Sequence, residues 1–135
     1  MNLRVTFFFI ATFFLLCGGI ISVLPSIPKL NKELKSILQK GRFQIKMGLY
    51  GLVSMLIFAL FPFDRVMLIG DLIPFIVCSA MTLLFMFGYI RISKHIDQKT
   101  LSRTEKIITI LQIPVGFAGI IAGLLHILLP GILFL

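Results

Sequence analysis

Four long apolar blocks make up most of the chain: Val5–Leu24, Phe43–Phe63, Leu72–Ile90 and Ile107–Leu129. Each is about as long as the 20 residues that a helix needs to cross a bilayer. Little sequence remains outside them, and the composition is 59% hydrophobic with 13% charged residues. The pattern predicts an all-α membrane protein with four transmembrane helices and a single domain, 1–135. We expect two tandem helical hairpins, 1–67 and 68–135.

The Lys and Arg residues gather in two of the predicted connections. Of 13 in the chain, six lie in loop 25–46 and five in loop 91–106. Four spans bring both loops to one side of the membrane, and the positive-inside rule makes that side cytoplasmic. Both termini are then outside, in a bacterial-type cytoplasmic membrane. The first block lacks a signal-peptide cleavage pattern, so we interpret it as a retained span. The net charge of +8 indicates a membrane surface rather than nucleic acid.

The first basic loop, SIPKLNKELKSILQKG, has the pattern of a short amphipathic helix. Ser26 could cap it, Pro28 suits its first turn and Gly41 could end it. Its apolar residues recur at helical spacing, away from most of the lysines, as in helices that lie on an anionic leaflet. A docking site for an acidic partner is the alternative. The membrane-surface lysines are Lys29, Lys32, Lys35 and Lys40.

The second basic loop ends in SRTEK. Ser102 and Glu105 have the spacing of a capping box, in which the two side chains satisfy N–H groups at a helix start. We therefore expect the fourth helix to begin near Arg103.

An internal repeat relates the second and fourth blocks. Residues 44–62, QIKMGLYGLVSMLIFALFP, align with 112–130, QIPVGFAGIIAGLLHILLP, at an offset of 68. Seven of the 19 positions are identical, among them two Gly, one Gln and one Pro. The first and third blocks match weakly at this offset. The alignment predicts a parallel repeat, with a pseudo-two-fold axis along the membrane normal.

The fourth block carries the candidate ligand or packing face. At 100° per residue, Gln112, Gly119 and His126 fall near one line, and Gly119 and Gly123 form a GxxxG that lets helices approach closely. His126 is either a polar clasp between helices or a ligand or proton site. As a clasp it would hydrogen-bond to hydroxyls on other helices, and it lies near enough to the outer end for water or headgroups to reach it. The candidate residues are Gln112, Gly116, Gly119, Gly123, His126, Tyr50 and Ser54, with Ser79 and Thr82 as further possible hydroxyl partners.

No residue spacing in the chain indicates a catalytic, metal or cofactor site. His95 and His126 lie on opposite sides of the predicted membrane, and the depths of Cys17 and Cys78 differ by too much for a disulfide. Our leading hypothesis is a non-enzymatic scaffold or accessory subunit of a membrane complex, and the expected assembly is a homo-oligomer or a larger membrane complex. The alternative is a small oligomeric transporter or channel that uses the stripe around Gln112 and His126. A lipid-modifying enzyme comes third.

Overall fold

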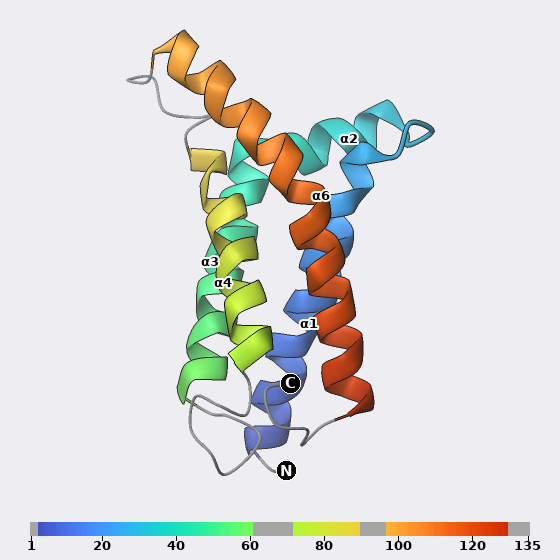
Figure 1. Ribbon diagram of the computed structural model, residues 1–135, viewed down its shortest axis with the longest axis vertical. Helices are drawn as coiled ribbons and strands as arrows, with labels where there is room; N and C mark the ends of the chain where they lie inside the picture. The colour runs from blue at the N-terminus through green and yellow to red at the C-terminus, as the bar shows by residue number, and fades with distance from the viewer. Residues whose placement is uncertain (1–2, 61–71, 90–96, 130–135) are drawn as a thin grey trace.

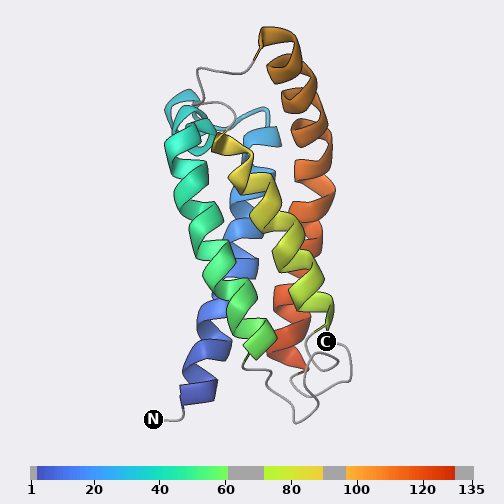
Figure 2. The ribbon, with the colours of Figure 1, turned by 90° about the vertical axis from the view of Figure 1, so that its left-hand side faces the viewer.

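The computed structural model describes residues 3–60, 72–89 and 97–129, and these residues are almost entirely helical. The longer helices run side by side (Figures 1 and 2). The predicted all-α fold is confirmed for these ranges. The elements are α1 (Leu3–Val23), the 3₁₀ turn η1 (Leu24–Ser26), α2 (Lys32–Gln39), α3 (Gly41–Leu60), α4 (Leu72–Met86) and α6 (Gln98–Leu128).

Three helices are long and apolar enough to cross a membrane: Val5–Ser26, which continues α1 into η1, then α3 and α6. The fourth apolar helix, α4, has 15 residues. At 1.5 Å per residue it is about 22 Å long, against a hydrocarbon core of about 30 Å. Three of the four predicted spans therefore reach the expected length within the described residues, and the fourth stays a prediction.

The two ends of the bundle differ in what they carry. The start of α1 and the end of α6 lie at one end, whereas α2 and the first turns of α6 lie at the other (Figures 1 and 2). The lysines of α2 and those of α6 are therefore at the same end. We call it the basic end.

The first connection is not the single helix that the sequence predicted. Ser26 belongs to η1, and the helix begins later, where the Asn31 side chain accepts a hydrogen bond of 2.9 Å from the Glu33 N–H. Gly41 begins α3 and does not end α2. The break falls at Lys40, whose extended backbone (φ −63°, ψ 126°) turns the chain without a glycine. As a result α2 is short and lies across the basic end (Figure 1).

The start of α6 also differs from the expectation. The helix begins at Gln98 after the N-cap residue Asp97, well before Arg103. Ser102 does not cap, because its hydroxyl donates to the Lys99 carbonyl at 3.0 Å. The residues from Gln98 onward are mostly good helix formers, so the helix extends upstream of the apolar block. Its 31 residues make it about 46 Å long, and its first turns project beyond the other helices (Figure 1).

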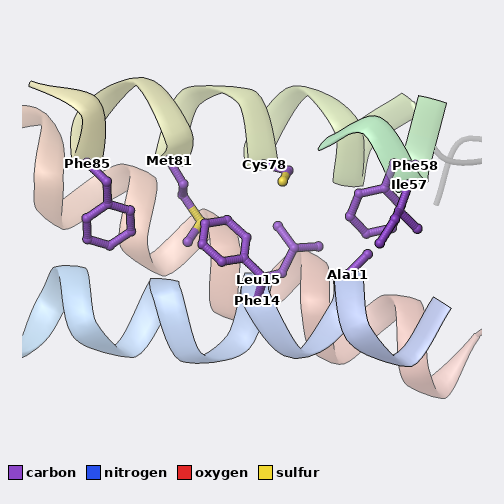
Figure 3. Close-up of a cluster of buried hydrophobic side chains, with 8 residues drawn as sticks. All are labelled: Ala11, Phe14, Leu15, Ile57, Phe58, Cys78, Met81 and Phe85. Carbon is purple, nitrogen blue, oxygen red and sulfur yellow. The ribbon is translucent and has the colours of Figure 1, made fainter. Parts of the chain in front are cut away.

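The closest helix packing joins the two predicted hairpins. Helix α1 packs most extensively against α6, and α3 against α4, while α1 with α3 and α4 with α6 pack less. Between them lies a core of apolar side chains from α1, α3 and α4 (Figure 3). Its members are Ala11, Phe14, Leu15, Ile57, Phe58, Cys78, Met81 and Phe85. The chain's first and last helices are thus direct neighbours.

Candidate functional site

The glycine face of α6 packs against α1. Gly116, Gly119 and Gly123 are all buried. A Cβ on Gly116 would lie 2.9 Å from the carbonyl oxygen of Gly19, and one on Gly123 would lie 2.9 Å from the Leu16 side chain. Because these Cβ atoms are absent, the two backbones come close enough for extensive van der Waals contact, which is what holds helices together in lipid.

Helix α3 has a corresponding glycine face that packs against α4. A Cβ on Gly48 would lie 2.7 Å from the Met86 sulfur, and one on Gly51 would meet the Thr82 hydroxyl. The approach also allows the Cys78 thiol to donate to the Gly51 carbonyl, with a sulfur–oxygen distance of 3.6 Å. Both glycine faces therefore contact a helix of the other predicted hairpin.

His126 lies where three helices meet. Its side chain is 1% exposed. The ring centroid is 4.7 Å from that of Phe8 on α1, at 35°, and 5.6 Å from that of Phe58 on α3, at 70°. The expectation that water or headgroups reach it is wrong, because these two rings and the helix backbones cover it. The contacts join α1, α3 and α6, and aromatic pairs of this kind contribute about 0.5–1.5 kcal/mol beyond their buried area.

The Ser54, Ser79 and Thr82 hydroxyls do not donate to His126. Ser54 donates to the Tyr50 carbonyl at 3.0 Å, Ser79 to the Phe75 carbonyl at 2.7 Å and Thr82 to the Cys78 carbonyl at 2.7 Å. Each acceptor lies four residues earlier in the same helix, where it is always within reach of a Ser or Thr side chain. The sequence argument looked for partners across helices and underestimated this local alternative.

The remaining candidates are spread along the bundle. Tyr50 is 53% exposed on the outer side of α3, and Gln112 is half-buried on α6. Gln44, which aligns with Gln112 in the predicted repeat, is buried, because Gly88 leaves room for it: a Cβ on Gly88 would lie 2.9 Å from Gln44 Oε1. The predicted stripe is therefore enclosed at its glycines and at His126, and more open at Gln112.

The lysines of the first connection are mostly exposed. Lys29, Lys32 and Lys40 are open, and Lys35 is half-buried. On the same short helix, Leu34 and Ile37 are 41% and 47% exposed. A helix that presents apolar and basic side chains together suits the boundary between lipid and water.

Sequence reasoning missed several residues of this site. Phe8 and Phe58 enclose His126. The predicted repeat aligns Phe58 with His126, but the alignment does not predict that the two rings touch. Ser22 is 1% exposed beside Gly116, and its Oγ has no hydrogen-bond partner among the described residues. No sequence signal marks it. Cys17 and Cys78 are free thiols, and His95 lies outside the described residues. In the ranges that the structure covers, no three His, Cys, Asp or Glu side chains group as metal ligands would.

Comparison with known proteins identifies a family. A protein-family model matches residues 2–126. The chain belongs to this family. The family has no assigned function. No curated protein and no solved structure matches the chain.

Proposed function

We propose that all four long helices cross a cytoplasmic membrane, with the basic end in the cytoplasm and both termini outside. Helix α4 supports this proposal because it runs beside α3 and α6 and presents apolar side chains outward. Ile76 and Leu83 on that side are 56% and 63% exposed. Apolar residues exposed on a bundle helix are the expected lipid-facing surface. The 11 Lys and Arg of the two basic connections support the orientation.

We further propose that the two hairpins are copies of one ancestral hairpin. At the offset of 68, buried residues of α3 coincide with buried residues of α6: Gly48 with Gly116, Gly51 with Gly119, Ser54 with Ala122 and Phe58 with His126. For α1 and α4 the burial patterns coincide at an offset of 67, which pairs Ala11 with Cys78, Phe14 with Met81, Leu15 with Thr82 and Gly18 with Phe85. The offset changes from 67 to 68 if the connection within the second hairpin is one residue longer than the connection within the first. Contact between Phe58 and His126 fits a pseudo-two-fold axis that passes between them.

As a function, we propose a non-enzymatic scaffold or accessory subunit of a membrane complex. The observation that carries this proposal is the basic end itself. There, α2 lies across the bundle and the first turns of α6 project beyond it (Figure 2), with Lys99, Arg103 and Lys106 exposed. A projecting cationic helix on a membrane-embedded bundle offers a surface to which an acidic protein partner or another subunit can bind.

Site-specific photo-crosslinking in intact membranes tests the scaffold. A photoreactive residue at Thr100, on the projecting turns, should give one discrete protein adduct. The same residue at Ile76, on the outward face of α4, serves as the matched control and should give lipid adducts. Replacing Arg103 and Lys106 by Gln should weaken the Thr100 adduct several-fold. Lipid adducts alone at Thr100, or an adduct indifferent to these charges, would refute the proposal.

Thiol labelling tests the orientation. In a background with Cys17 and Cys78 replaced by Ala, Lys32→Cys should resist a membrane-impermeant reagent in intact cells and react once the cells are opened. Leu3→Cys, at the start of α1, should react in intact cells. The reverse pattern would overturn the topology.

The alternative, a small oligomeric transporter or channel, needs a pathway between copies, because the core of Figure 3 fills the centre of one bundle. Purified protein in liposomes should pass no ion or small solute, and His126→Phe should preserve cellular function. Measurable flux that His126→Phe abolishes would favour transport over a scaffold.

A further inference from the structure

Two adjoining pockets lie along the outer face of α1. One, of about 290 Å³, lies between α1 and the start of α3 and is lined by Phe13, Phe14, Cys17, Ile21, Phe43, Met47 and Tyr50. The other, of about 320 Å³, continues toward the opposite end, past Phe9 to Ile127 of α6. Phe13 and Tyr50 line both, so the two pockets form one apolar groove.

The groove has the dimensions of a lipid chain within one leaflet. From Ile21 to Phe9 it follows α1 for twelve residues, which is about 18 Å at 1.5 Å per residue. One leaflet contributes about half of a hydrocarbon core of about 30 Å. Each pocket alone has a volume at the lower end of the range for small-ligand sites, about 300–1,000 Å³.

Positive charge borders the groove at the basic end. Arg42 and Lys46 on α3 are both exposed, one turn apart, and each directly precedes a groove residue, Phe43 or Met47. Residues four apart lie on one side of a helix, so Arg42, Lys46 and Tyr50 form a row along the edge of the groove. The end of the groove that holds Phe43 is therefore the end with two cations beside it.

We propose that this groove binds one anionic phospholipid from the leaflet at the basic end. The phosphate lies against Arg42 and Lys46, and one acyl chain lies in the groove across Phe13 and Tyr50. A zwitterionic lipid offers the same chain but less net attraction to the two cations. The inference rests on the proposed membrane crossing, and not on the scaffold role or on which side is cytoplasmic.

Tyrosine fluorescence offers a direct probe of this groove. The chain has no Trp and two Tyr, so Tyr89→Phe leaves Tyr50 as the single intrinsic fluorophore. This variant is reconstituted in phosphatidylcholine bilayers, and lipids with brominated acyl chains, which quench nearby Tyr emission, replace part of the bilayer. Brominated phosphatidylglycerol should quench Tyr50 at a lower mole fraction than brominated phosphatidylcholine. We expect a preference of about five-fold for each cation, equivalent to about 1 kcal/mol per charge.

Two charge variants of the Tyr89→Phe protein decide whether the preference belongs to this site. The double variant Arg42→Gln with Lys46→Gln should lower the preference for phosphatidylglycerol over phosphatidylcholine to a ratio close to one. Lys99→Gln with Arg103→Gln removes the same charge from the projecting turns of α6 and should leave it intact. Equal quenching by the two lipids would overturn the proposal, as would a preference that survives the first pair or disappears with the second. The quenching assay needs no protein partner. Its result therefore does not depend on whether the crosslinking experiment supports the scaffold.

Discussion

The glycine faces of α3 and α6 have the same spacing but different neighbours. A Cβ on Gly48 would lie 2.7 Å from the Met86 sulfur and 3.1 Å from the Met86 backbone nitrogen. A Cβ on Gly116 would lie 2.8 Å from Val23 Cγ2 and 2.9 Å from the Gly19 carbonyl oxygen, and from the other side a Cβ on Gly19 would lie 2.7 Å from the Gly116 carbonyl oxygen. At Gly116 and Gly19 the backbones of α6 and α1 approach each other, whereas at Gly48 the closest atom belongs to a flexible methionine side chain. We therefore expect the contact at Gly116 to be the more rigid of the two.

A second difference lies on the outer sides of the same helices. The groove beside α3 is bordered by Arg42, Lys46 and Tyr50. At the offset of 68, the corresponding residues of α6 are Ile110, Pro114 and Ala118. Under the proposed repeat, α3 and α6 share their buried glycines and differ at these outer positions, as expected when the inner positions are constrained by contact and the outer ones are available for a specific role.

The largest effect should come from the aromatic cluster in which Phe8 and Phe58 contact His126. Phe58→Ala leaves a cavity beside His126 and should lower the free energy of unfolding by about 3–5 kcal/mol. His126→Phe, which makes the second copy resemble the first, keeps the ring and should change it by less than about 1.5 kcal/mol. Reversible denaturation in mixed micelles measures both. A loss of several kcal/mol in His126→Phe would mean that the imidazole makes a specific polar interaction, and would revive the ligand or proton site.

Adding one methyl group to each glycine face should distinguish rigid from adaptable packing. Gly116→Ala forces a Cβ against the Gly19 carbonyl and should cost about 3 kcal/mol, the upper part of the usual range for overpacking. Gly48→Ala needs a shift of the Met86 side chain and should cost about 1 kcal/mol. The same denaturation assay compares them. Equal losses would show that the two interfaces are equally rigid.

Arg42→Ile introduces the residue found at position 110, which aligns with Arg42 under the proposed repeat. In the Tyr50 quenching assay it should lower the preference for phosphatidylglycerol about five-fold, because one cation contributes about 1 kcal/mol near a membrane surface. Arg103→Ile is the matched control on the projecting turns. A similar fall in both variants would mean that overall charge, and not the groove, sets the preference.

The smallest effect concerns two hydroxyls that correspond at the offset of 67. Thr12 donates to the Phe8 carbonyl at 2.8 Å, as Ser79 does to the Phe75 carbonyl. Thr12→Val and Ser79→Ala should each cost less than about 1 kcal/mol, because the carbonyl keeps its helical hydrogen bond. Unequal losses would argue against the 67-residue correspondence of α1 and α4.

The positions of the long apolar helices could be predicted from the sequence. The residues that cap those helices could not, because several candidate caps compete. The apolar blocks locate α1, α3, α4 and the membrane part of α6, because hydrophobic length depends on composition alone. Predictions that rested on one side chain were less reliable. Ser26 and Ser102 have the residue type of an N-cap, yet Asn31 and Asp97 occupy that position. Competing caps differ by about 1 kcal/mol, so neighbouring helices and good helix formers upstream decide between them.

For this protein, the sequence by itself determined the helical class, the apolar faces and the concentration of positive charge in two connections. Tertiary structure decided the rest: that α1 packs against α6, that His126 lies between Phe8 and Phe58, and that Arg42 and Lys46 border a groove. The physical reason is the distance along the chain over which each property acts. Hydropathy and charge act position by position and can be read along the chain. Contacts between helices depend on which glycine faces meet, and many pairings of four similar apolar helices satisfy the same pattern until side chains select one.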